Sequence, residues 1–351
     1  MKRHLAACLL GTLSLGAMAA PASPNTTNPD WHVVQRFQLG GDGGWDYLAY
    51  DPGAKRLYIS RADRVLVLDA TSGKRLGEID GLSGVHGIAM ADDLGRGYIS
   101  NGRADTVTVF DPGTLKTTQT IAVSGHNPDA ILYDPFSKRV LTFNGRSDDA
   151  SVIDATNGKL LGTIKLPGKP EFAVSDGKGH VYDNIEDKSE LVEIDPKAMQ
   201  ITHTWALKDC EDPSGLAMDI AHRRLFSVCQ NKTMAVTDAD SGKLVASVPI
   251  GDGPDAAAFD PQRQLAFSSN GESGTLTVVH EDDADHYRVL ANVATQKSAR
   301  TMALQPGGDV YLSAAQFGPR PAPSSDNPHA RPPVLPGSFT ILAVGEWPMR
   351  F

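Results

Sequence analysis

The sequence predicts an all-β fold, a seven-bladed β-propeller with four antiparallel strands in each blade. One short pattern, clearest in residues 127–135, returns seven times along the 351 residues. The copies begin at residues 46, 86, 129, 171, 214, 255 and 300, so the period is 40 to 45 residues. The copies consist of short apolar strands and lack the apolar stripe every three to four residues that helical repeats need. This combination is typical of propeller blades.

The first copy shows the expected order of strands in a blade. Residues 46–50 form the predicted inner strand, which is almost wholly small and apolar, as a strand near a crowded axis must be. Residues 56–60, 65–69 and 75–79 form the next three strands, joined by turns rich in Asp, Pro and Gly. The last blade has no fourth strand after residues 338–344. Because residues 33–39 match outer strands such as 244–250, we expect them to close the ring and remove two open sheet edges.

Two further patterns recur at strand ends. The turn after the third strand is Asp-Ala-x-x-Gly-Lys at 69–74, 154–159 and 238–243, where Asp accepts local backbone hydrogen bonds and Gly closes the hairpin. The second strand of the second copy ends in Tyr-Ile-Ser-Asn at 98–101. These residues resemble the Tyr-Val-Thr-Asn signature of the YVTN-repeat propellers, and the turns resemble those of its YncE-like periplasmic members. The resemblance extends over essentially the whole chain after residue 32 and implies a seven-bladed fold. It does not imply one function, since propellers serve binding, scaffolding and hydrolysis alike.

The first 20 residues have the pattern of a cleaved signal peptide. Lys2 and Arg3 precede an uncharged apolar run, and Ala17-Met18-Ala19 has small residues at cleavage spacing. We therefore expect a periplasmic or secreted protein, with a flexible segment at 21–31 and a single propeller domain at 32–351. No other stretch reaches the length of a membrane span.

The charge of the mature chain bears on its partners, and its cysteine content bears on its compartment. Of the 33 Lys and Arg residues, two fall in the leader, so 31 remain against 42 Asp and Glu and the formal charge is −11. An acidic surface repels phosphate backbones, which disfavours nucleic acid as a partner, including the single-stranded DNA that some YncE-like propellers are thought to bind. Cys210 and Cys229 remain after processing. An oxidising compartment favours a disulfide, and the repeat frame brings the two together at adjacent strand ends. Two free thiols or a soft-metal site are the alternatives.

A ring of polar residues opens the inner strands. In chain order they are Asp46, His86, Asp129, Glu171, Ser214, Asp255 and Arg300. Sevenfold placement puts them around one mouth of the central channel, where the carboxylates need counter-charges or shifted pKa values. A second polar tier is expected from the ends of the second strands at Asn101, Asn144, Asn184 and Asn270, with His126 close by. The proline-rich insertion 316–336 should overhang this mouth as a flap, with Arg320, Asp326, His329 and Arg331 turned toward the ring.

Two functions of this funnel compete with a purely structural role, in which the ring only accepts hydrogen bonds from loop amides. The first is a monomeric binding protein for a metal ion, a small molecule or a protein partner. Asp46, His86, Asp129 and Glu171 offer donors for Ca²⁺, Mn²⁺, Zn²⁺ or Fe²⁺, and further ligand contacts are expected from Asp255, Asn101, Asn144, Asn270 and His126.

The second is a metal-assisted hydrolase, lactonase or lyase. Here His86 and Glu171 would act at the metal centre, and Arg300 would hold a substrate carboxylate or an oxyanion. The sequence holds no Gly-x-Ser-x-Gly elbow, no His-Glu-x-x-His pair and no phosphate loop, so the familiar enzyme motifs do not decide between the two functions.

Overall fold

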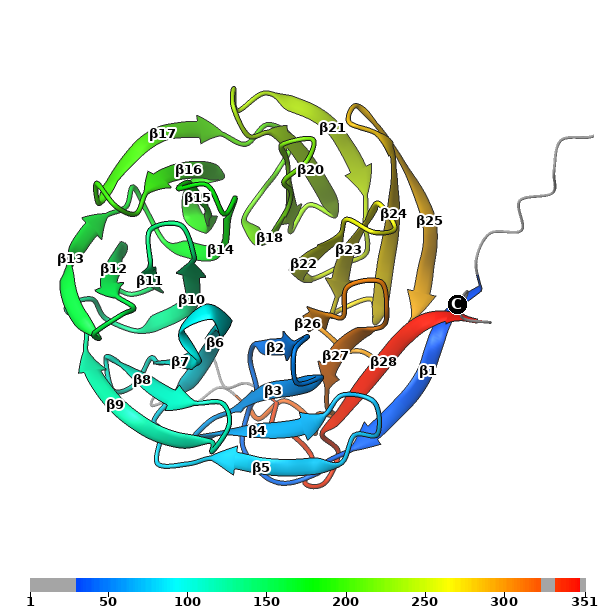
Figure 1. The fold of residues 1–351 in the computed structure, drawn as a ribbon. Coiled ribbons are helices and arrows are strands. Elements are labelled where there is room, and N and C mark those ends of the chain that lie inside the picture. Colours follow the sequence, from blue (N-terminus) through cyan, green and yellow to red (C-terminus); the bar gives the residue numbers. More distant parts are fainter. Residues whose placement is uncertain (1–29, 323–331, 348–351) are drawn as a thin grey trace, which may run out of the picture.

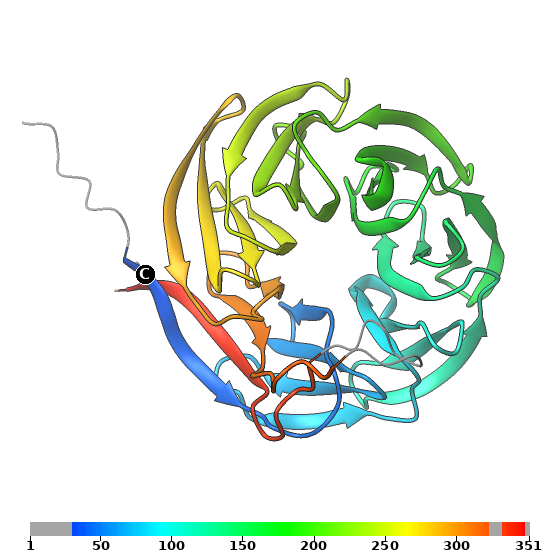
Figure 2. The same cartoon turned by 180° about the vertical axis from the view of Figure 1, so that it is seen from behind.

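The strands form seven four-stranded antiparallel sheets, in a computed structural model that describes residues 30–322 and 332–347. Figure 1 shows the sheets as blades around a common axis, and Figure 2 shows the same ring from behind. Six sheets follow chain order from the inner to the outer strand. The predicted fold class is confirmed. Within the described residues, no helix is long and apolar enough to cross a bilayer.

Blades 1 to 4 take up the first half of the ring. Blade 1 comprises β2 (Leu48–Asp51), β3 (Arg56–Arg61), β4 (Arg64–Asp69) and β5 (Arg75–Ile79). Blade 2 comprises β6 (Val85–Ala91), β7 (Arg96–Asn101), β8 (Thr106–Asp111) and β9 (Lys116–Ala122), with the short 3₁₀ helix η1 (Asp92–Leu94). Blade 3 comprises β10 (Pro128–Asp134), β11 (Arg139–Asn144), β12 (Asp149–Asp154) and β13 (Lys159–Lys165). Blade 4 comprises β14 (Pro170–Ser175), β15 (Val181–Ile185), β16 (Glu190–Asp195) and β17 (Gln200–Ala206), with η2 (Glu186–Lys188).

Blades 5 to 7 complete the ring. Blade 5 comprises β18 (Pro213–Asp219), β19 (Arg224–Cys229), β20 (Thr233–Asp238) and β21 (Leu244–Pro249). Blade 6 comprises β22 (Pro254–Asp260), β23 (Leu265–Asn270), β24 (Thr275–Asp283) and β25 (His286–Ala294). Blade 7 comprises β26 (Thr301–Leu304), β27 (Val310–Ala314), β28 (Thr340–Trp347) and β1 (Asp30–Gln38).

The apolar core lies between neighbouring blades. The second and third strands of each blade are buried on both faces, so their apolar side chains pack against the blades on either side. For example, Tyr58 of blade 1 packs on Phe110 of blade 2 with ring centroids 5.6 Å apart. At the axis the inner strands approach so closely that a Cβ atom on Gly215 would lie 2.5 Å from the backbone nitrogen of Ala257. This crowding explains why the inner strands are built of small residues.

The N-terminal strand closes the ring, as predicted. β1 pairs antiparallel with β28 at the outer edge of blade 7, and the two strands lie side by side in Figure 1. β1 begins at Asp30, two residues before the predicted start of the domain, and Trp31 is buried against Phe267 of blade 6 with ring centroids 5.5 Å apart. The strand therefore contributes to the core as well as to the sheet.

Cys210 and Cys229 form a disulfide, as predicted. Cys229 is the last residue of β19 and lies opposite Pro213, the first residue of β18. The bridge therefore ties the segment that leads into the inner strand of blade 5 to the end of the second strand.

Candidate functional site

The polar ring lies at one mouth of the propeller because of strand register. In blade 3, for example, Pro128 at the start of β10 pairs with Asn144 at the end of β11, which pairs with Asp149 at the start of β12. In blades 2 to 6 a register shift brackets the ring residue, as between Pro128 and Ile131 around Asp129. Such bulges bend a strand and redirect a side chain. Here they lie where the ring side chains meet around the axis.

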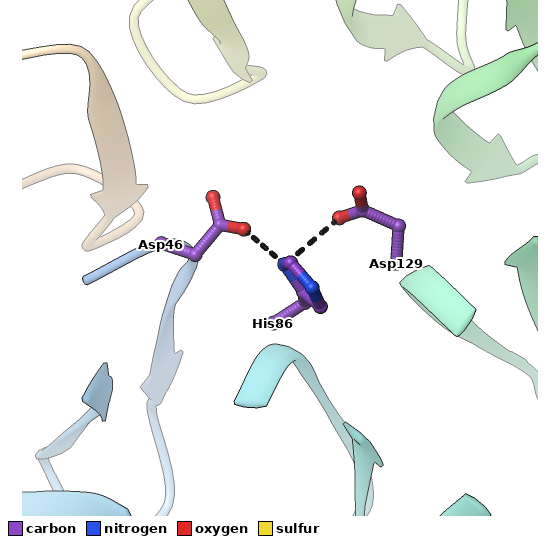
Figure 3. A group of neighbouring side chains, drawn as sticks. All are labelled: Asp46, His86 and Asp129. Atoms are coloured by element: carbon purple, nitrogen blue, oxygen red, sulfur yellow. Dashed lines mark hydrogen bonds and ion pairs between the residues drawn. The ribbon is translucent and has the colours of Figure 1, made fainter. Parts of the chain in front are cut away.

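Three ring residues form a close cluster, shown in Figure 3. The Nδ1 atom of His86 lies 2.6 Å from Oδ2 of Asp46 and 3.5 Å from Oδ1 of Asp129. The three side chains are between 19% and 26% exposed, so solvent still reaches them. Burial lowers the pKa of His86, but the hydrogen bond with Asp46 and the charge of Asp129 outweigh burial, and the net pKa is raised. Burial and the charge of Asp46 raise the pKa of Asp129 to about 6, although His86 opposes the shift.

The other charged ring residues have ion-pair partners outside the cluster, and Arg300 also reaches Asp46. The Nη1 atom of Arg300 lies 3.0 Å from Oδ2 of Asp255, and its Nη2 atom lies 3.9 Å from Oδ1 of Asp46. Lys169 forms ion pairs with both Glu171 and Glu186. Burial raises the pKa of Glu171, and the Lys169 ammonium opposes that shift. Glu171, predicted as a metal ligand, is therefore held by Lys169 outside the three-residue cluster.

Two aromatic rings pack against each other beside the charged groups of the ring. Tyr47 of blade 1 packs on Phe172 of blade 4 with ring centroids 4.7 Å apart, and it also contacts the apolar cluster of blade 3 that includes Ala130. Burial raises the pKa of the Tyr47 hydroxyl well above its ordinary value, and the carboxylates of the ring add to this shift. Sequence reasoning missed both Tyr47 and Lys169. Two features of the sequence could have indicated them. Tyr47 is a bulky residue at the start of a predicted inner strand, where small residues are expected, and Lys169 is a cation two residues before Glu171.

A cavity of about 340 Å³ opens beside the cluster. Its polar wall includes Arg300, Asp255 and Lys297, and its apolar wall is Trp45 and Phe317. Phe317 belongs to the predicted flap and lies 5.8 Å from Trp45 between ring centroids. The described part of the flap therefore reaches the mouth.

The polar side chains of the flap were predicted to turn toward the ring, and the one that the structure describes does not line the cavity. Arg320 is exposed and lines no part of the cavity, whereas Asp326, His329 and Arg331 lie outside the described residues.

The predicted second tier does not face the axis. Asn101, Asn144 and Asn270 are buried, and their amide nitrogens donate to side chains on the third strand of their own blades, such as Thr108, Ser151 and Thr277. Asn184 is also buried and donates to the backbone carbonyl oxygen of Ser214. The first three amides therefore link strands within one blade, and the amide of Asn184 links blade 4 to blade 5. His126 is 69% exposed and paired with Asp105 at 2.9 Å, away from the three-residue cluster.

Asp183 of β15 lies near Glu171, and its burial makes the stability of the fold depend on pH. It is fully buried, and neither carboxylate oxygen has a hydrogen-bond partner among the described residues. Burial, and then the charge of Glu171, raise the pKa of Asp183 well above its ordinary value. The folded state thus keeps a proton that the unfolded chain loses near pH 4, and folding stability falls as pH rises above that value.

We expect Asp183→Asn to remove this loss, because Asn mimics the neutral acid. At about pH 4 the free energies of unfolding of variant and wild type should agree, and the variant should become progressively more stable than the wild type as the pH rises toward 7. Urea denaturation at several pH values measures the difference. Asp63→Asn, at a side chain 69% exposed, is the control with little pH dependence. A stability difference for Asp183→Asn that does not grow with pH would contradict the account.

Comparison with known proteins agrees with the fold. No family model matches the chain. It is 26% identical over 222 residues to the uncharacterized protein YncE of Salmonella typhimurium and 25% identical to that of Salmonella typhi. Each alignment covers 62% of this chain but 51% of the relative, so the match spans about half the length of these curated relatives.

Two solved structures share the architecture. Kuenenia stuttgartiensis hydrazine synthase superposes with a TM-score of 0.70 at 17% identity, covering 78% of this chain and 94% of that chain. A chain in a crystal structure of the mitotic checkpoint complex gives 0.73 at 13% identity, covering 96% and 99%. At these identities the likeness concerns the fold alone. The fold and the ring define a seven-bladed β-propeller with a charged axial site. The sequence matches add a similarity to YncE and support a resemblance to the YncE-like β-propellers.

Proposed function

We propose that the protein is a binding propeller that holds a divalent cation on Asp46, His86 and Asp129. The observation that carries the proposal is that one donor atom from each residue lies within 4.8 Å of the other two. Ligand atoms about 2.1 Å from an ion lie roughly 3 Å apart. The separations of 2.6 and 3.5 Å from Nδ1 of His86 bracket that value. An ion would replace the proton on Nδ1, the atom that faces both carboxylates.

The donor set narrows the choice of ion. One imidazole nitrogen with two carboxylate oxygens suits Mn²⁺, Fe²⁺ or Zn²⁺ better than Ca²⁺, which prefers oxygen ligands alone. The adjoining cavity supports a second component of the ligand. Arg300 and Lys297 offer positive charge, and Trp45 and Phe317 offer apolar surface. A small molecule with a carboxylate and an apolar body fits this combination.

Calorimetric titration of chelator-treated protein with Mn²⁺ and Zn²⁺ tests the cation site. We expect one ion to bind at this cluster in the wild type, with an affinity that falls at least about 100-fold in His86→Ala and in Asp129→Asn, because each variant removes a ligand. His126→Ala is the matched control, since its imidazole lies at the same mouth but outside the cluster. If the titration curves of His86→Ala and the wild type coincide, the cation is not bound here.

A second candidate function is a metal-assisted hydrolase, lactonase or lyase at the same site. The position of Arg300 favours it, with one nitrogen 3.9 Å from Asp46 and its side chain in the cavity wall. A bound cation would polarise a carbonyl or activate water, and Arg300 would hold the substrate carboxylate or the developing oxyanion. Lactones and esters are the substrates to screen. Turnover that survives both His86→Ala and Arg300→Ala would place the activity elsewhere.

The proposal includes export and action as a monomer. The disulfide supports an oxidising compartment, in agreement with the leader pattern, whose residues lie outside the described ranges. Fractionation of producing cells, with mass spectrometry of the mature N-terminus, tests the location. Light scattering after size exclusion tests the oligomeric state. Full-length protein retained in the cytoplasm would contradict export, and a stable dimer would contradict the monomer.

A further inference from the structure

We propose that Asp219, His222 and Glu281 form a second divalent-cation site, between blades 5 and 6 at the mouth opposite the ring. Asp219 ends β18, His222 lies in the turn that follows, and Glu281 lies in β24. The Nδ1 atom of His222 is 2.7 Å from Oδ2 of Asp219 and 3.5 Å from Oε1 of Glu281. One donor atom from each residue lies within 4.8 Å of the other two.

The buried carboxylate of Glu281 points to a missing partner. The Glu281 side chain is 0% exposed and that of Asp219 is 4% exposed. The hydroxyl of Tyr287 donates to Oε1 of Glu281 at 3.2 Å, but Oε2 has no partner among the described residues. A buried carboxylate without a full set of partners is costly, and a cation that binds it removes the cost.

No described Lys or Arg supplies the missing charge. Of the two cations that follow His222 in the sequence, Arg223 directs its guanidinium to Asp176 and Asp240, and Arg224 directs its guanidinium to Asp238 and Asp285. Within the described residues, the ion pairs of Asp219 and Glu281 are those with His222 alone. A single imidazole therefore faces two carboxylates.

The internal repeats show that packing does not require Glu281. Its backbone N–H donates to the carbonyl oxygen of Gln264, just before the second strand of its blade. The same bond is made in other blades by Ala70, Ala155 and Ala239, all of them buried. A methyl group therefore fills this position in blades 1, 3 and 5. The carboxylate in blade 6 is an addition that packing does not explain.

The donor set defines the ligand. Two carboxylates and an imidazole suit a transition-metal dication such as Zn²⁺. His222 is 39% exposed, which leaves coordination positions open to water. A cation bound here would link the inner strand of blade 5 to the third strand of blade 6, so binding would stabilise the ring against unfolding.

Thermal unfolding with Zn²⁺ as the probe tests the site separately from the funnel. In the His86→Ala background, one Zn²⁺ should still bind and should raise the Tm by about 5 °C at saturating concentration. Adding Glu281→Ala should abolish both the binding and the shift. In the absence of metal, Glu281→Ala should melt at or above the wild-type temperature, because it restores the alanine of blades 1, 3 and 5.

Two outcomes would overturn the proposal. One is a His86→Ala protein that neither binds Zn²⁺ nor shifts its Tm, which would leave a proton shared between the two carboxylates as the explanation. The other is a double variant that binds Zn²⁺ as tightly as His86→Ala. Glu281→Ala alone, with His86 intact, reports on the funnel, so failure of either site is recognised independently.

Discussion

Deletion of β1 is expected to open the ring and to abolish cooperative unfolding of the propeller. The strand supplies the outermost position of blade 7 and pairs with β28 from Asp30↔Trp347 to Gln38↔Thr340. It also joins the blades on either side. Trp31 packs in a cluster with Phe267 of blade 6, and Phe37 packs in a cluster with Leu57 of blade 1. Without β1, these clusters lose their cover and the edge of β28 is free to pair with another chain.

Circular dichroism melts and sedimentation measure this result. The variant lacking residues 30–38 should show no sharp transition and should aggregate. Trp31→Ala is the milder test and should lower the free energy of unfolding by about 3 to 5 kcal/mol, the usual cost of removing a buried aromatic side chain. Val34→Ala, on the same strand but 37% exposed, should have little effect. A deletion variant that melts cooperatively within a few degrees of the wild type would show that the ring closes without β1.

The fold was predictable because it depends on the period of the chain. Blades are similar units, so the spacing of their inner strands determines the number of sheets, and a missing outer strand at one end implies a donor at the other. Small residues in the inner strands follow from the close approach of neighbouring blades, as at Gly215 and Ala257. The disulfide was predictable for the same reason, since antiparallel register relates the end of one strand to the beginning of its neighbour.

The site was only partly predictable, because it depends on side-chain direction. The position of the ring followed from the repeat, and the cluster of Asp46, His86 and Asp129 lies within it. The partition into separate groups did not follow, since Lys169 lies outside the repeated position and yet pairs with Glu171. Asn101 pairs with Val85, the residue just before the ring residue His86, but the side chain of Asn101 is directed toward Thr108 on the third strand. A sequence indicates that residues alternate along a strand but does not indicate which face meets the axis.

Arg61 is the residue whose loss should most affect both the fold and the cation cluster. It is fully buried at the end of β3, where Asn101, Asn144 and Asn270 stand in other blades. Its guanidinium donates to the carbonyl oxygens of Gly40, Asp42, Gly43 and Gly44, and it lies 3.9 Å from the ring centroid of Phe339. Burial lowers the pKa of Arg61 to about 10, so the group remains charged at neutral pH. It holds the glycine-rich loop that leads into Trp45 and Asp46.

We expect Arg61→Met to lower the free energy of unfolding by about 4 kcal/mol, because the loop loses four hydrogen bonds from a buried, charged donor. Arg61→Lys should recover part of this loss, since an ammonium keeps the charge but not the planar set of donors. The affinity of the funnel for Mn²⁺ should fall at least about 10-fold in Arg61→Met, because Asp46 is no longer held beside His86. Denaturant melts and calorimetry measure the two effects.

The matched control for Arg61 is Arg64, which begins β4 three residues later and pairs with Arg61 across the turn. Arg64 also donates to the carbonyl oxygen of Asp42, at 3.2 Å, but its side chain is 27% exposed and pairs with Asp63. Arg64→Met should therefore change stability by less than about 1 kcal/mol and leave Mn²⁺ binding intact. If Arg61→Met and Arg64→Met lose equal stability and equal Mn²⁺ affinity, then positive charge at this mouth supports the loop, and the specific hydrogen bonds of the Arg61 guanidinium do not. A stable Arg61→Met that still binds Mn²⁺ at full affinity would show that Asp46 is positioned by the strands alone.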